Sequence, residues 1–179
     1  MLSGKFLESY MADLLVKMRG DATSLPAKHP VRNILVAGLG GFIAIALLAY
    51  LADSLETVLI MGSFGASCVL VFGFPDAPFS QPRNVILGHF ISTLTGLTFV
   101  ILFGPVWWSV ALAVGVAIML MMASRTVHPP AGSNPVIVFL LQPGWDYLFF
   151  PTLSGAVLLV LVALLYNNLS RSDNYPKYW

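Results

Sequence analysis

Two short polar stretches inside apolar segments of the sequence could bind a small anion. The first runs from Ser63 to Ser67, and the second runs from Gly132 to Asn134, which Pro135 follows. An Asn-Pro pair is typical of a helix start, because Asn caps free backbone N–H groups and proline lacks one; Ser67 is also a good N-cap. Helix starts carry a partial positive charge, so two that face each other would hold an anion. The predicted binding residues are Ser63, Gly65, Ser67, His128, Pro129, Pro130, Gly132, Ser133 and Asn134.

Several further polar residues could lie along the path of an anion. His89 lies in an apolar segment, where an ionisable side chain is costly and usually faces the interior of a helix bundle; a structural, hydrogen-bonded histidine fits the same position. His128 could pass on an anion or a proton. Arg125 could attract an anion, or it could act only as a signal for membrane topology. Asn84 could lie on the pathway or could be only a helix cap. The predicted pathway residues are Arg83, Asn84, His89 and Arg125.

The composition indicates an integral membrane protein. Of the 179 residues, 58% are hydrophobic and 9% are charged, whereas soluble domains carry about 25% charged residues. The mean hydropathy is +0.84. The formal net charge of +1 excludes a broad cationic surface for nucleic acid. A single cysteine, Cys68, excludes intrachain disulfides and cysteine-based metal centres, and we predict neither a metal nor a cofactor.

Six apolar segments follow an amphipathic N-terminal stretch. Residues 1–28 have apolar side chains at helical spacing with many polar interruptions, which predicts an interfacial helix or a helix packed on a partner subunit. Four of the later segments are long enough to span a bilayer, and the other two contain Gly, Ser or Pro and are predicted to be broken. The segments are 33–51, 57–73, 84–103, 105–122, 131–141 and 149–167, within a transmembrane domain of residues 29–167 that a cytoplasmic tail, 168–179, follows.

The two halves of the transmembrane domain repeat each other. A shift of 67 positions places residues 65–72 on 132–139 and Gly88 on Gly155. Because each repeat crosses the membrane three times, an odd number, the second repeat has the opposite orientation in the membrane. With six passages and both termini in the cytoplasm, all Lys and Arg residues lie on the cytoplasmic side, as the positive-inside rule requires. We therefore predict an all-α membrane protein with an inverted repeat of three passages each, the second passage of each half being broken near mid-membrane.

Three motifs in order resemble the HPP family of small integral membrane proteins. They are His128-Pro129-Pro130-Ala131-Gly132, the stretch 62–67, and residues 81–84 followed by Gly88-His89. The resemblance covers about residues 29–167. The family is commonly described with four spans, which differs from the six passages predicted above. Members from plastid envelopes and photosynthetic bacteria are associated with nitrite transport, so the resemblance implies nitrite as the substrate.

These observations together predict a transporter or channel for a small inorganic anion, with nitrite implied, and no enzymatic activity. One alternative is a membrane adaptor that recruits a partner through its N-terminal helix. Another is an intramembrane enzyme that uses Ser67 or Ser133 with His89 or His128, although no acidic residue is placed to orient a histidine.

The predicted partners are the lipid bilayer, the anion and further copies of the chain. Small residues at positions 38–41 favour helix association, which predicts a homo-oligomer. The N-terminal stretch does not resemble a transit peptide, which favours a prokaryotic inner membrane.

Overall fold

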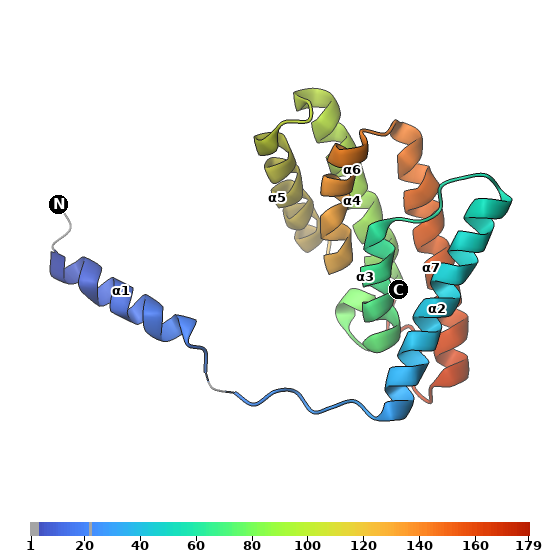
Figure 1. Ribbon diagram of the computed structural model, residues 1–179, viewed down its shortest axis with the longest axis horizontal. Helices are drawn as coiled ribbons and strands as arrows, with labels where there is room; N and C mark the ends of the chain where they lie inside the picture. The colour runs from blue at the N-terminus through green and yellow to red at the C-terminus, as the bar shows by residue number, and fades with distance from the viewer. Residues whose placement is uncertain (1–3, 22) are drawn as a thin grey trace. The chain divides into compact units, whose positions relative to one another are not determined.

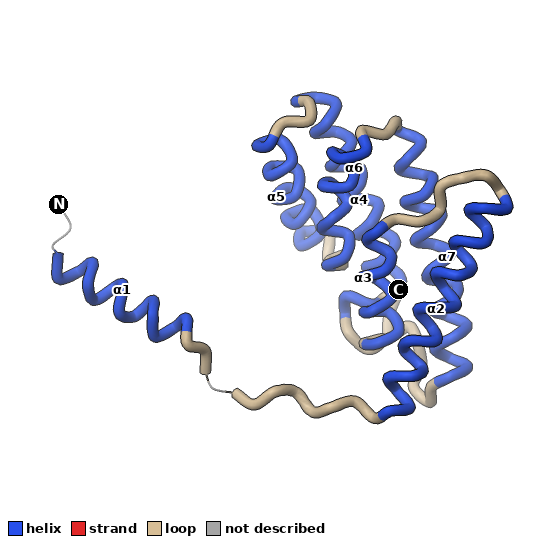
Figure 2. Tube along the Cα trace, viewed as in Figure 1, coloured by secondary structure: helices blue, strands red, loops and turns tan. Residues whose placement is uncertain are grey.

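The computed structural model describes residues 4–21 and 23–179, and side chains from residue 9 onward apart from residue 22. In this part of the chain the regular elements are helices, and no strand is present (Figure 2). The chain divides into two compact units, residues 1–30 and 31–179. The prediction of an all-helical protein is therefore confirmed for the described residues.

The first unit contains the helix α1 (Gly4–Met18). The side chains of residues 9–18 are exposed, and Lys17 forms an ion pair with Asp13 one turn earlier on this helix. Gly20 has a φ of +71°, a left-handed conformation that glycine tolerates best and that commonly ends helices. The helix is therefore shorter than the predicted 1–28, of which residues 1–3 and 22 lie outside the described residues. An interfacial role for α1 stays a prediction.

The second unit is a bundle of six helices among its described residues (Figure 1). Three stretches are long and apolar enough to cross a membrane: α2, α4, and the run Trp145–Ser170 that ends in α7. The segment 105–122, expected to be long enough, forms a helix of 17 residues, which is at the lower limit. The helices are α2 (Val31–Ser54), α3 (Gly62–Gly73), α4 (Pro82–Phe103), α5 (Trp107–Ala123), α6 (Asn134–Leu141) and α7 (Ser154–Ser170), with short turns η1 (Pro78–Ser80), η2 (Pro129–Ser133), η3 (Trp145–Leu148) and η4 (Phe149–Leu153).

The helix start predicted at Ser67 is wrong. An extended stretch ends at Met61, with φ −120° and ψ 145°, and α3 then runs without interruption from Gly62 through Ser67. The Ser67 hydroxyl lies 3.0 Å from the carbonyl oxygen of Ser63, one turn earlier, instead of capping free N–H groups. Serine can make either contact, so its presence did not determine where the helix begins.

The second predicted helix start is displaced by one residue. Asn134 is the first residue of α6, and Ser133, which precedes it, already has helical dihedrals, φ −82° and ψ −14°. Neither side chain caps the helix, because the Asn134 amide points to α4. The passage therefore combines the turn η2 with a short helix. The inverted repeat and the mid-membrane breaks stay predictions.

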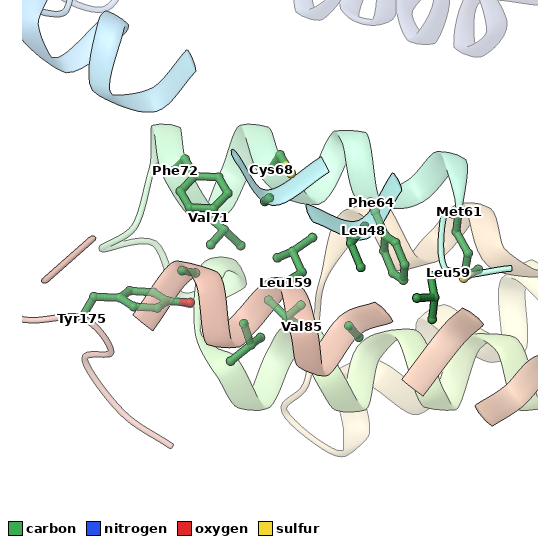
Figure 3. Close-up of a cluster of buried hydrophobic side chains, with 14 residues drawn as sticks. Leu48, Leu59, Met61, Phe64, Cys68, Val71, Phe72, Val85, Leu159 and Tyr175 are labelled. Atoms are coloured by element: carbon green, nitrogen blue, oxygen red, sulfur yellow. The ribbon is translucent and has the colours of Figure 1, made fainter. Parts of the chain in front are cut away.

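The start of α2 and the end of α7 lie at the same end of the bundle (Figure 1). Arg32 at the start of α2 donates a hydrogen bond of 2.9 Å to the carbonyl oxygen of Ser170, the last residue of α7. Beside these helices, Phe64, Val71 and other side chains of α3 pack against α7 in the main hydrophobic core (Figure 3). This packing fixes the position of the inner face of α3, on which Ser67 also lies.

Candidate functional site

Four polar side chains from four segments meet inside the second unit. All four are fully buried, and we call them the polar cluster. They are Ser67 in the middle of α3, His89 two turns into α4, His128 between α5 and η2, and Asn134 at the start of α6.

The Ser67 hydroxyl is the centre of the polar cluster. Its Oγ lies 3.0 Å from His89 Nε2 and 2.8 Å from His128 Nε2. The third neighbour is the carbonyl oxygen of Ser63, also at 3.0 Å. The two imidazole rings are 5.0 Å apart between centroids and approach edge to face. One hydroxyl therefore links two histidines that come from segments far apart in the sequence.

The Asn134 amide sets the tautomer of His89. Asn134 Nδ2 lies 3.3 Å from the backbone carbonyl oxygen of His89, which can only accept, and 2.9 Å from Thr93 Oγ1. The same nitrogen lies 3.0 Å from His89 Nδ1, and because an amide nitrogen cannot accept a hydrogen bond, Nδ1 carries no hydrogen; the two amide hydrogens are shared among these three acceptors. The hydrogen of a neutral His89 is consequently on Nε2, which donates to Ser67 Oγ. The Phe64 ring packs edge to face on His89 with 5.0 Å between centroids.

A backbone carbonyl sets the tautomer of His128. His128 Nδ1 lies 2.7 Å from the carbonyl oxygen of Phe79, in the loop between α3 and α4. Because this oxygen can only accept, Nδ1 carries a hydrogen. In the neutral ring Nε2 is then an acceptor, and it faces the Ser67 hydroxyl. The two histidines therefore present different groups to Ser67, a donor from His89 and an acceptor from His128.

Two glycines of α4 allow the other segments to approach it closely. A Cβ atom on Gly88 would lie 2.8 Å from His128 Cβ and 3.0 Å from the carbonyl oxygen of Thr126. A Cβ atom on Gly96 would lie 2.8 Å from the Cα atom of Pro135. These positions require glycine, because any larger residue would push the His128 segment or the start of α6 away from α4.

The α3–α4 loop and the C-terminal tail surround the same end of the cluster. The Tyr175 hydroxyl donates a hydrogen bond of 2.8 Å to the carbonyl oxygen of Ser80. Burial raises the pKa of this hydroxyl above its usual value. The Tyr178 hydroxyl donates to Asn84 Oδ1 at 3.0 Å, and Asn84 Nδ2 donates to the carbonyl oxygen of Val127 at 2.9 Å. The C-terminal tail thus supports the α3–α4 loop and the start of α4, both of which contact the segment of His128.

The structure separates several predicted site residues from the polar cluster. Gly65, Pro129 and Ser133 are exposed, and the Ser133 hydroxyl turns back to the carbonyl oxygen of Pro130 at 2.8 Å. Gly65 is exposed because it lies on the outer face of α3, half a turn from Ser67. Of the predicted set, Ser63, Ser67, His89, His128 and Asn134 are buried at or beside the cluster, together with Pro130, while Gly132 is half-buried.

The predicted pathway residues lie mostly at the end of the bundle. Arg83 and Arg125 are exposed, and Arg83 donates to the carbonyl oxygen of Ser124 at 3.3 Å, which joins the start of α4 to the end of α5. Asn84 is buried and holds the backbone one residue before His128. These contacts are structural, and only His89 of the predicted pathway belongs to the cluster.

Sequence reasoning missed three hydroxyl groups that extend the polar cluster. Thr93 accepts from Asn134 and lies 3.3 Å from the hydroxyl of Thr152, and Ser92 donates to the carbonyl oxygen of Ala131 at 2.6 Å. Thr93 follows His89 by four positions, so helical spacing could have identified it. Thr152 and the carbonyl of Phe79 have no comparable signal in the sequence.

The polar cluster does not have the arrangement of a metal centre or a hydrolase. Among the described residues there is no group of three or more His, Cys, Asp or Glu side chains that could hold a metal ion. Ser67 and His128 are spaced like a nucleophile and its base, but a carbonyl oxygen occupies the place of the orienting carboxylate, and Ser67 is fully buried. What the cluster can do is donate and accept hydrogen bonds.

Comparisons with known proteins identify the type of protein. A family model described as the HPP transmembrane region matches residues 26–176. A transmembrane protein of Dictyostelium discoideum is 37% identical over 153 residues, which is 80% of this chain and 54% of that protein. A second transmembrane protein of the same organism is 34% identical over 185 residues, which is 97% of this chain and 59% of that protein. The chain thus spans little more than half the length of these relatives. No solved structure matches it.

Proposed function

Because the chain belongs to the HPP family of integral membrane proteins, we propose that it transports a small inorganic anion, with the polar cluster as the binding site. Nitrite is the first substrate to test, as the family resemblance implies. The observation that carries the proposal is that two histidines, a serine and an asparagine are fully buried together in a membrane protein. Ionisable residues inside membrane-spanning segments are costly and usually serve transport.

The depth of the polar cluster supports a transport role. His89 follows the first residue of α4 by seven positions, which corresponds to about 10 Å along the helix axis. α4 is one of the three stretches able to cross the hydrocarbon core. Polar groups this far from the helix end are outside the reach of bulk water, so they need a specific reason to be there.

The chemistry of the polar cluster favours an anion over a cation. The groups that contact Ser67 and His89 are imidazole, hydroxyl, amide and backbone carbonyl groups, and no contact with a carboxylate occurs among the described residues. Two side-chain oxygens buried at or beside the cluster, Ser63 Oγ and Asn134 Oδ1, have no hydrogen-bond partner within the described part of the chain. The Ser63 hydroxyl can donate a hydrogen bond to an anion, whereas Asn134 Oδ1 can only accept one, so of these two atoms only the serine supports an anion site.

The course of the helices supports the inverted repeat. In Figure 1, α2, α3 and α4 run up, down and up, whereas α5, α6 and α7 run down, up and down. Arg32, Arg83 and Arg171 all bind backbone carbonyls at the same end of the bundle. We propose that this end faces the cytoplasm, as the positive-inside rule implies. A prokaryotic inner membrane stays a prediction, since both relatives named above come from a eukaryote.

A homo-oligomer also stays a proposal. Gly38 and Leu39 are exposed on α2, where a second copy could pack. Gly40 is already used within the chain, because a Cβ atom there would lie 2.5 Å from the ring of Phe72.

The test is flux into liposomes that contain the purified full chain. We expect nitrite to enter these liposomes faster than it enters liposomes without protein, and sulfate, a larger dianion, to enter both at the same rate. Nitrite uptake that protein does not accelerate would refute the proposed function. Equal acceleration of both anions would refute a selective binding site.

A further inference from the structure

A polar cavity, which we call the arginine cavity, lies at the end of the bundle where α2 begins and α7 ends. Its volume is about 140 Å³, and three segments line it: the start of α2, the loop after α3, and the residues directly after α7. Arg32 and Arg171 contribute guanidinium groups, whereas Asp76 and Asp173 contribute carboxylates. The lining residues all belong to the second unit, and none of them belongs to the polar cluster. The arginine cavity is therefore a separate candidate binding site.

The arginine cavity lies at the depth of lipid headgroups. Arg32 is the second residue of α2, and Arg171 directly follows the last residue of α7. α2 and the stretch that ends in α7 are both long and apolar enough to cross a membrane. The ends of spanning helices lie at the boundary between the hydrocarbon core and the headgroups, so both guanidinium groups are placed near the phosphates of the bilayer. Basic pockets between spanning helices bind such headgroups.

The two arginines keep donors for a ligand. Arg32 Nη2 donates to the carbonyl oxygen of Ser170 at 2.9 Å, and Arg171 Nη2 donates to the carbonyl oxygen of Phe72 near the end of α3. A guanidinium group carries five N–H donors, so one such contact leaves most of them unused. The carbonyls at a helix end carry only about half a negative charge, which offsets part of each guanidinium charge. Within the described part of the chain, no carboxylate forms an ion pair with either arginine.

The two carboxylates of the arginine cavity differ in their pairing. Asp76 pairs with Lys177 of the tail at 3.0 Å, so its charge is already balanced. Asp173 lines the same cavity as the arginines, is exposed, and forms no ion pair among the residues that the structure describes. The cavity thus contains positive and negative groups that do not pair with one another. Asp173 would repel a simple anion and the arginines would repel a simple cation, so a ligand that carries both charges fits best.

We propose that the arginine cavity binds the headgroup of a phosphatidylethanolamine molecule from the leaflet at this end of the bundle. The phosphate diester accepts hydrogen bonds from Arg32 and Arg171, as guanidinium groups favour. The ammonium group donates to Asp173. The two helix ends and Asp173 together offset the two guanidinium charges, so a headgroup without net charge leaves the site balanced. Phosphatidylglycerol lacks the ammonium group, and the methylated ammonium group of phosphatidylcholine has no N–H to donate.

Native mass spectrometry of the full chain in detergent micelles tests this lipid selectivity. The protein is titrated separately with phosphatidylethanolamine, phosphatidylglycerol and phosphatidylcholine that have identical acyl chains. We expect the Kd for phosphatidylethanolamine to be about twofold to fivefold lower than the other two, which is the contribution of one exposed ion pair. Equal Kd values for the three lipids, or a lower value for either of the others, would overturn the proposal.

Substitutions with matched controls test whether the arginine cavity provides the selectivity. Asp173→Asn should equalise the Kd values for phosphatidylethanolamine and phosphatidylglycerol, whereas Asp146→Asn, an exposed carboxylate in η3, should keep them different. Arg32→Gln should weaken the binding of both lipids. Arg83→Gln, which loses the same charge and also a hydrogen bond to a carbonyl oxygen at a helix end, should leave both Kd values unchanged. A preference for phosphatidylethanolamine that survives Asp173→Asn would remove this aspartate from the site and refute the proposal.

A soluble competitor distinguishes the lipid from a free compound with the same headgroup. Glycerophosphoethanolamine carries the phosphate diester and the ammonium group without acyl chains. We expect it to displace little bound lipid at equal concentration, because it cannot bury acyl chains against the helices. Strong displacement would assign the cavity to a soluble ligand and overturn binding of the lipid. Nitrite uptake enters none of these measurements, so this inference and the proposed function can fail independently.

Discussion

Gly88→Ala should damage the polar cluster by moving His128. The added Cβ atom would lie 2.8 Å from His128 Cβ, whereas ordinary contacts begin at 3.4 Å, so the two segments must separate by about 0.6 Å. The same shift applied to His128 Nε2, now 2.8 Å from Ser67 Oγ, would stretch this hydrogen bond beyond its usual length. Because the second obstacle is a backbone oxygen of Thr126, at 3.0 Å, a side-chain rotation alone cannot relieve the contact.

The expected cost of Gly88→Ala is about 1–3 kcal/mol of unfolding free energy, which is typical of overpacking a buried site. For a chain of this size each kcal/mol corresponds to roughly 2–4 °C in Tm. Thermal unfolding in detergent and nitrite uptake in liposomes would be measured on the same preparation. We expect a lower Tm and a slower uptake.

Gly115→Ala is the matched control for this substitution. Gly115 also lies inside a helix, α5, but nothing is within 4 Å of the position that its Cβ would occupy. Alanine favours a helix over glycine by about 1 kcal/mol, so this variant should unfold at the same or a higher temperature. If Gly88→Ala behaved like Gly115→Ala in both assays, the close approach of His128 to α4 would not position the site, and the reasoning would be refuted.

Three further substitutions test other parts of the structure. Asn134→Asp places a carboxylate beside His89 and should abolish uptake of an anion through charge repulsion; unchanged uptake would exclude this residue from the site. Tyr175→Phe removes a buried hydrogen bond between the tail and the α3–α4 loop. It should lower the unfolding free energy, measured by denaturant titration, by about 1–2 kcal/mol. An unchanged unfolding free energy would mean that this hydrogen bond of the tail does not stabilise the fold. Arg83→Cys, in a background where Cys68 is replaced by Ala, should react with an impermeant thiol reagent from the cytoplasmic side; labelling from the outside would contradict the proposed orientation.

The residues of the polar cluster could be recognised from the sequence because their types are rare in apolar segments. His89 stands in an apolar segment, whereas Ser67 and Asn134 each end one of the two short polar stretches inside such segments. Burying such side chains is unfavourable unless they find a polar partner, so the sequence predicts that His89 faces the interior of the bundle. The structure brings these three together with His128, although it does so through side-chain contacts instead of facing helix starts.

The position of the first helix start could not be predicted from local residue types. Ser67 is equally suited to cap a helix or to bond the carbonyl one turn earlier, and the packing of Phe64 and Val71 in the core favours a helix that already begins at Gly62. The tautomer of His128 depends on the carbonyl oxygen of Phe79. Every residue has such an oxygen, so no pattern of side chains could indicate this contact.

The most direct test of the anion site compares two buried serines that both lie in helices. Ser67→Ala removes the hydroxyl that joins the two histidines, whereas Ser109→Ala in α5 removes a hydroxyl that contacts only the carbonyl oxygen of Phe99, at 3.3 Å. Protein-dependent nitrite uptake should fall to the level of empty liposomes for Ser67→Ala and stay close to that of the unmodified protein for Ser109→Ala. Equal uptake by the two variants would show that the anion does not bind at the polar cluster.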